Sequence, residues 1–344
     1  MIKGFMTRPA GLLAGLALTA LAVPAQAAEV NVYSGRHYDT DRQVYDAFTE
    51  RTGIKVNIIE GKSDALLERI ISEGDQSPAD ILITVDAGRL WRAEDAGLFQ
   101  AASSAILDQN VPASLRHPEG LWYGLSKRVR GIIYNREATA GTELPKTYEE
   151  MATPKYQGEV CIRTSSNIYN QSLVGSIIAA SGEDAALAWA EGIRDNLARP
   201  PQGGDTDQIR AVAAGECDYA IANHYYYMRL ATSDDAANRA VAAKVGFIAP
   251  NQDGRGAHAN ISGAGILANA PNVDEARRLL EYLTTPAAQA IFARSNNEYP
   301  TNPNVAPIEA LELVGTFKED TINARVFGEN NPLALKIADQ ANWP

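Results

Sequence analysis

The sequence predicts an α/β protein built on doubly wound sheets, and two observations support this. Short runs rich in β-branched and aromatic residues alternate with longer runs whose apolar residues recur at helical spacing. A strand–helix alternation of this kind is typical of a parallel sheet covered by helices. The 344 residues also exceed what one compact hydrophobic core usually holds, so two domains are expected.

The first part of the chain is predicted to contain three strand–helix units. The predicted strands are residues 29–33, 54–59 and 79–85, and the helices that follow them are residues 41–51, residues 63–73 and a third helix that leads to Gly97. Gly53 and Gly74 end the first two helices, because glycine readily adopts the backbone conformation of a helix C-cap. Residues 121–134 contain two strand-like runs with little helix between them, which indicates a crossover between domains.

A second α/β series follows the crossover. The predicted strands are residues 159–163 and 218–222, and the predicted helices are residues 166–180, 183–197, 205–214, 225–230 and 274–294. A capping box at residues 147–150 predicts one more helix, and residues 244–248 are expected to return the chain to the first domain. The loop at residues 198–207 has two prolines and two glycines and is long enough to reach into a cleft.

The N-terminus has the pattern of an export signal. Lys3 and Arg8 form a basic start, residues 11–23 are apolar, and small residues lead up to Ala27. The apolar run is shorter than the ~20 residues that a membrane-spanning helix needs. We therefore predict a signal peptide over residues 1–27, cleavage after Ala27 and a soluble mature protein secreted across one membrane.

Charge and cysteine count narrow the possible partners. The formal net charge is -11, and removal of Lys3 and Arg8 with the signal makes it -13, which argues against nucleic acid or an anionic membrane. Cys161 and Cys217 are the only cysteines. In an oxidising compartment they predict one disulfide, with two buried thiols as the alternative.

Tyrosines beside histidines follow several predicted strands. His37 and Tyr38 follow the first strand, Tyr169 lies in the first turn of a later helix, and residues 224–227 read HYYY after another strand. Ligands of open α/β sheets bind at the carboxyl ends of the strands. Phenolate oxygens suit a hard, highly charged cation such as ferric iron. Tyrosines also line hydrophobic cores and the clefts of sugar- or peptide-binding proteins, so the residues alone leave both interpretations open.

Enzyme signatures are incomplete. Residues 61–63 read GKS like the end of a phosphate-binding loop, but Val56 stands where that motif needs glycine. The sequence also contains no GxSxG or HExxH motif, and its four histidines are scattered. We therefore expect a binding protein rather than an enzyme.

Several segments resemble the ferric-iron-binding periplasmic proteins of ABC transporters. The similarity runs from about residue 29 into the C-terminal region. It is carried by YSGRHYDTD at residues 33–41, GDQSPADI at 74–81, SNIYNQ at 166–171, ARPP at 198–201, NHYYYMRL at 223–230 and EYP at 298–300. The His-Tyr opening and the adjacent tyrosine pair are the specific features.

The resemblance implies a ligand set for ferric iron. It consists of four tyrosines, Tyr38, Tyr169, Tyr225 and Tyr226, with His37 as a candidate fifth ligand. Some relatives add a carboxylate after the third strand, but Asp86 stands in a different context here and is not counted. Some also hold a synergistic anion, carbonate or phosphate.

Charge balance adds a second group of residues. Four phenolates around a trivalent ion leave about one negative charge, so a nearby buried cation is expected. Arg199 on the long loop is the first choice and Arg163 the second.

The resemblance also implies the architecture, a type II periplasmic-binding-protein fold with two lobes joined by crossover strands. One lobe is placed at residues 28–130 and 256–306, and the other at residues 131–255 and 307–344. Iron would bridge the lobes of a monomer and favour the closed form, which the membrane subunits of an ABC transporter would recognise. The alternatives are a binder of a polyamine, sugar or oxyanion in the same fold and, less favoured, a two-lobed periplasmic enzyme.

Overall fold

The computed structural model describes residues 1–2, 4, 28–36 and 38–344. The cleavage site predicted after Ala27 and the candidate ligand His37 lie outside these residues. In the described residues no helix combines the length and the apolar character needed to cross a bilayer.

Ten strands of the described chain form one sheet, whose main path has the order β2-β1-β3-β9-β5-β7-β6. The strands are β1 (Glu29–Ser34), β2 (Lys55–Glu60), β3 (Ile81–Val85), β4 (Phe99–Gln100), β5 (Tyr123–Asn135), β6 (Val160–Cys161), β7 (Tyr219–Asn223), β8 (Val245–Ile248), β9 (Ala259–Leu267) and β10 (Tyr299–Pro300). Off this path, β4 pairs with β9, and both β8 and β10 pair with β5.

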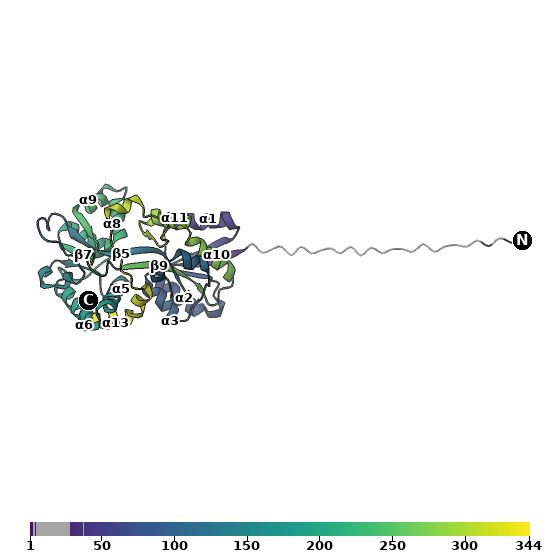
Figure 1. Cartoon of the computed structure of the whole chain (residues 1–344), viewed down its shortest axis with the longest axis horizontal. Coiled ribbons are helices and arrows are strands. Elements are labelled where there is room, and N and C mark those ends of the chain that lie inside the picture. The colour runs from purple at the N-terminus through teal and green to yellow at the C-terminus, as the bar shows by residue number, and fades with distance from the viewer. Residues whose placement is uncertain (3, 5–27, 37) are drawn as a thin grey trace.

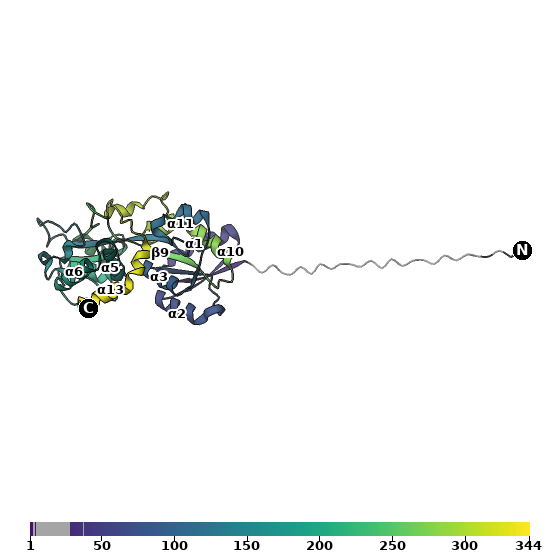
Figure 2. The ribbon, with the colours of Figure 1, turned by 60° about the horizontal axis from the view of Figure 1, so that its bottom comes forward.

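Helices cover this sheet in two groups. They are α1 (Arg42–Thr52), α2 (Ser63–Glu73), α3 (Ala87–Asp95), α4 (Ala105–Asn110), α5 (Ile168–Ser181), α6 (Glu183–Asp195), α7 (Asp205–Ala214), α8 (His224–Ala231), α9 (Ala236–Lys244), α10 (Val273–Leu283), α11 (Pro286–Asn296), α12 (Ala324–Glu329) and α13 (Asn331–Gln340). Figure 1 shows β5 and β9 between a group that contains α1, α2, α3 and α10 and a group that contains α6 and α13. Figure 2 keeps the same grouping after the turn.

The predicted α/β class is confirmed, and the sheet is mixed rather than wholly parallel. β1 runs parallel to β2 and β3, and β6 runs parallel to β7. The central strand β9 is antiparallel to both β3 and β5, and β5 is antiparallel to β7. The strands that carry the chain between the two groups therefore supply the antiparallel pairs.

The crossover is one continuous strand. Residues 123–129 of β5 pair with β9, whereas residues 130–135 pair with β7 and β8. The two strand-like runs predicted near residues 121–134 are thus a single strand. The return predicted at residues 244–248 is wrong, because these residues form β8 beside the second half of β5, and β9 returns instead. All nine residues of β9 are buried, so it lacks the alternation that marks a strand with one exposed face.

Two predicted helices differ from the structure. The helix expected at residues 274–294 is two helices, α10 and α11, because Pro286 has no N–H and starts the second one. At the predicted capping box the Glu150 N–H does donate to Thr147 Oγ1 at 3.0 Å, but only a short 3-10 turn, Glu150–Ala152, follows. A second 3-10 turn then begins at Pro154.

Three buried clusters fill the protein. The first packs around β1, β3 and β9, and it also receives Ala324 and Phe327 from the C-terminal segment. The other two lie on opposite faces of β5, since Ile132 belongs to one and the adjacent Ile133 to the other. The predicted lobe boundaries stay a prediction.

Cys161 and Cys217 form a disulfide, as predicted. Cys161 ends β6 and Cys217 precedes the neighbouring strand β7, and their Cα atoms are 5.9 Å apart. The bond closes a loop of 56 residues. Loop-closure entropy gives it a stabilisation of about 4 kcal/mol.

A buried ionic network joins β5 and β9 to the segments beside them. Glu298 accepts from Arg36 Nη1 at 2.8 Å and from Arg128 Nη2 at 2.6 Å. Arg36 also pairs with Asp41 at 2.9 Å, and Ser126 donates to Glu298 at 2.9 Å. Burial alone would raise the pKa of Glu298, but Arg36 and Arg128 outweigh it and lower that pKa to about 2.

We expect Glu298→Gln to lower the free energy of unfolding at pH 7 by about 3 kcal/mol, because it leaves buried guanidinium charge uncompensated. A carboxyl group whose pKa is lowered on folding stabilises the fold at pH values above its ordinary pKa of 4.5. This stabilisation is lost as the pH falls from 4.5 toward 2. The difference in unfolding free energy between the variant and the native protein should therefore shrink over that range in denaturant titrations. The exposed control Glu68→Gln should show no such loss. Equal stability of Glu298→Gln and native protein at pH 7 would contradict this account.

Candidate functional site

The tyrosine pair lies at the junction of β7 and α8. The strand ends at Asn223 and the helix begins at His224, so Tyr225 and Tyr226 occupy its first turn. Their ring centroids are 4.2 Å apart at an interplanar angle of 32°. Tyr225 is buried, and Tyr226 is partly exposed. Asn223 stands at the N-cap position of α8 but makes no side-chain cap hydrogen bond, and its side-chain oxygen accepts from Arg130 at 3.2 Å.

Tyr169 reaches the pair from α5. Its backbone N–H donates to the cap residue Asn167 at 3.2 Å, which fixes the first turn of the helix. The hydroxyl oxygens of Tyr169 and Tyr225 are 3.4 Å apart. Two tyrosines that are 56 residues apart in the sequence thus present their oxygens to one point.

Tyr38 approaches these tyrosines from the N-terminal part of the chain. It precedes the short 3-10 turn that opens α1, and it is partly exposed. The guanidinium carbon of Arg229 lies 4.8 Å from the centre of the Tyr38 ring, 4.9 Å from that of Tyr225 and 5.6 Å from that of Tyr226. Arg229 therefore packs against three of the four predicted tyrosines at once.

More guanidinium groups surround the tyrosine cluster, which we define as Tyr38, Tyr169, Tyr225 and Tyr226. Arg128 lies 5.4 Å from the Tyr225 ring centre, and Arg130 and Arg163 lie 5.8 Å and 5.5 Å from that of Tyr169. Arg36 lies 5.0 Å from the ring centre of Tyr38.

The environment keeps the inner phenols protonated when no cation is present. Burial raises the pKa of Tyr225 well above its ordinary value, and the neighbouring Tyr169 and Tyr226 raise it further. Burial also raises the pKa of Tyr226, again with Tyr169 adding to the effect. A multivalent cation would reverse this balance, because it favours the phenolate form of each ligand. The cluster can thus bind a hard, highly charged ion with release of protons.

The two predicted charge-balancing arginines differ in position. Arg163 lies beside Tyr169 and within 3.5 Å of Asp205. Arg199, the first choice, pairs with Glu216 at 3.1 Å and donates to Gln208 at 3.3 Å. Among the contacts of the described residues, Arg199 makes none with the tyrosine cluster. The Arg199 side chain is therefore engaged by Glu216 and Gln208 of the neighbouring segment.

Sequence reasoning missed four arginines that contact the tyrosine cluster, namely Arg36, Arg128, Arg130 and Arg229. Arg128 and Arg130 are two residues apart on β5, and this i, i+2 spacing places both side chains on one face of the strand. Arg229 follows Tyr225 by four residues on α8, so both lie on one side of the helix. These spacings were visible in the sequence, but their relation to the tyrosines depends on the fold.

Carboxylate and histidine groups offer no alternative metal centre in the described chain. No group of three or more His, Cys, Asp or Glu side chains there is placed to hold a metal ion. Asp86 caps α3 and accepts from Gly88 at 2.8 Å, Ser172 at 2.5 Å and Asn260 at 3.0 Å, so its oxygens are occupied. His224 Nδ1 accepts from Val129 at 3.1 Å, which leaves Nε2 to donate to a backbone oxygen.

Comparisons with known proteins identify relatives of this chain. The family described as bacterial extracellular solute-binding protein matches residues 76–313. Iron uptake protein A1 of a Synechocystis strain is 51% identical over 93% of this chain and 89% of its own length. The major ferric iron-binding protein of Neisseria meningitidis serogroup B is 30% identical over 96% of this chain and 97% of its own length.

Solved structures give the same result. The Trichodesmium protein FutA, in complex with iron and citrate, superposes with a TM-score of 0.89 at 52% identity, over 92% of this chain and all of that one. Apo FutA2 from Synechocystis superposes with a TM-score of 0.87 at 47% identity, over 93% of this chain and all of that one. The chain therefore belongs to the bacterial extracellular solute-binding proteins, and among them to the ferric-iron-binding family.

Proposed function

We propose that the protein captures ferric iron in the periplasm and delivers it to an ABC transporter for uptake. The ion is held by the phenolate oxygens of Tyr38, Tyr169, Tyr225 and Tyr226, with His37 as the fifth ligand. The observation that carries this proposal is the convergence of Tyr169 and Tyr225, whose hydroxyl oxygens are 3.4 Å apart, within the reach of Arg229.

The surrounding charge supports a trivalent ion. Four phenolates and one ferric ion carry a net charge of about -1, which a low-dielectric site cannot hold without compensation. Arg229 and Arg128 lie closest to the buried Tyr225, at 4.9 Å and 5.4 Å from its ring centre. An organic cation such as a polyamine does not displace the phenol protons as a multivalent metal ion does, so at the same point it would meet neutral phenols and be repelled by the guanidinium groups.

An anion completes the coordination shell in this proposal. Arg163 is the natural contact, because its side chain is 23% exposed and lies beside Tyr169. Carbonate and phosphate both have oxygens that bind the ion and the guanidinium together. Citrate accompanies iron in the Trichodesmium structure and, like carbonate and phosphate, is an anion with oxygen donors.

The proposed cycle requires export, closure and no covalent step. The chain is exported by its predicted signal peptide, cleaved after Ala27, and acts as a monomer. Tyr38 comes from the predicted first lobe and the other tyrosines from the second, so iron stabilises the closed form by its higher affinity for it. Transporter subunits then recognise that form.

Iron-free protein that takes up one ferric ion should gain a visible absorption band from the phenolate ligands. Because Tyr225 and Tyr226 are protonated before binding, uptake should release protons, and iron affinity should fall as pH falls. Absorption titrations against a competing chelator at several pH values measure both effects. A colourless iron-loaded protein, or an affinity independent of pH, would contradict the proposal.

We expect Tyr225→Phe and Tyr226→Phe each to weaken iron binding by at least about tenfold and to shift the visible band. Tyr227→Phe is the matched control, since each variant removes one hydroxyl. Successive helical side chains point about 100° apart, and the Tyr227 ring is buried and stacks on Phe247 with centroids 6.4 Å apart. Its loss should leave iron binding unchanged. A strong effect at Tyr227 with none at Tyr225 would mean that the ligand register is wrong.

A further inference from the structure

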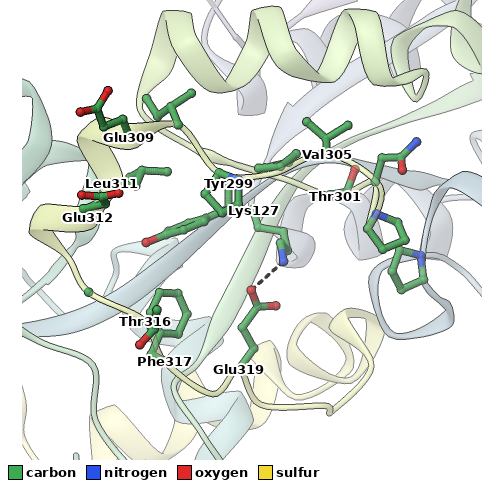
Figure 3. A pocket seen from close by; sticks show the side chains of 17 residues that line it. Lys127, Tyr299, Thr301, Val305, Glu309, Leu311, Glu312, Thr316, Phe317 and Glu319 are labelled. Carbon is green, nitrogen blue, oxygen red and sulfur yellow. Dashed lines mark hydrogen bonds and ion pairs between the residues drawn. The ribbon is translucent and has the colours of Figure 1, made fainter.

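A cavity that none of the four cluster tyrosines lines lies between β10 and the segment at residues 301–319. Its volume is about 710 Å³, within the range of small-molecule sites in proteins. Figure 3 shows the rings of Tyr299 and Phe317 on one side and the Lys127–Glu319 ion pair beside them. Most of the remaining wall is proline and aliphatic, including Val305 and Leu311.

The Tyr299 hydroxyl is a buried polar group without a partner. The residue is 6% exposed, and its hydroxyl has no hydrogen-bond partner among the described residues. Burial raises the pKa of Tyr299 and Glu319 raises it further, so the phenol stays neutral. A buried hydroxyl left unpaired costs free energy, and a ligand in this cavity could recover that cost.

The charges around the cavity favour a cation. Lys127 pairs with Glu319 at 2.6 Å, which neutralises both. Glu309 and Glu312 also line the cavity, both are exposed, and neither forms an ion pair within the described part of the chain. In Figure 3 the hydroxyl end of Tyr299 points toward the side where Glu312 lies. The cavity therefore combines aromatic rings with two uncompensated negative charges.

We propose that this cavity is a second ligand site, specific for a small organic cation with an aromatic body. The body packs on Tyr299 and Phe317, whose rings meet edge to face with centroids 5.3 Å apart. The ammonium group donates to the Tyr299 oxygen and is attracted by Glu309 and Glu312. This site uses none of the predicted iron ligands, so its occupation can be measured in iron-free protein.

Three indole probes that differ in charge test the proposal. Tryptamine is a cation, tryptophol is its neutral analogue, and indole-3-acetate is an anion. Calorimetric titration of the iron-free full chain should give one tryptamine site, with tryptophol about tenfold weaker and indole-3-acetate weaker still. Failure of tryptamine to bind, or equal affinity for all three probes, would overturn the proposal.

Variants locate the site. The double variant Glu309→Gln/Glu312→Gln should bind tryptamine only as well as tryptophol, with tryptophol affinity unchanged. Tyr299→Phe keeps the ring and should weaken tryptamine binding several-fold. The control Glu50→Gln/Glu68→Gln makes the same change in net charge at exposed positions elsewhere and should bind tryptamine like the native chain. Equal tryptamine binding by all these variants would place the probe outside this cavity and overturn the proposal.

Discussion

Buried charge is the constraint on which the rest of this structure depends. Phenolate oxygens can be gathered inside a protein only if positive charge is fixed close to them. The chain meets this condition with arginines from separate elements, Arg128 and Arg130 on β5 and Arg229 on α8. These guanidinium groups lie beside the tyrosine rings, so the fold itself supplies positive charge next to the proposed ion.

Arg128 also links the tyrosine cluster to the buried ionic network. Arg128 contacts Tyr225 on one side and pairs with Glu298 on the other. Glu298 is followed by Tyr299, which packs against His224, and His224 donates to the backbone oxygen of Asn297. The segment at residues 297–299 therefore contacts the residue before the tyrosine pair, supplies Glu298 to the buried ionic network and forms part of the wall of the cavity beside β10. Substitutions in this segment should therefore affect more than one of these three features.

Much of the fold followed from local pattern. Helices that end at glycine, such as α1 before Gly53 and α2 before Gly74, lie within about one residue of their predicted bounds. Local pattern placed the tyrosines at the carboxyl ends of strands, but their selection as a ligand set came from the resemblance to the ferric-iron-binding family and stays a prediction. What could not be predicted depends on tertiary contacts. The wholly buried strand β9 has no alternating pattern, and nothing local distinguishes Arg163, which faces Tyr169, from Arg199, which faces Glu216.

In the proposed function, one ferric ion joins Tyr38, near the N-terminus, to three tyrosines from the middle of the chain. A crystal structure of the iron-loaded protein, with an anomalous difference map at the iron absorption edge, measures this most directly. The account predicts a single strong peak within bonding distance of the hydroxyl oxygens of Tyr38, Tyr169, Tyr225 and Tyr226. A peak bound by carboxylates elsewhere, or by Tyr169, Tyr225 and Tyr226 without Tyr38, would contradict it.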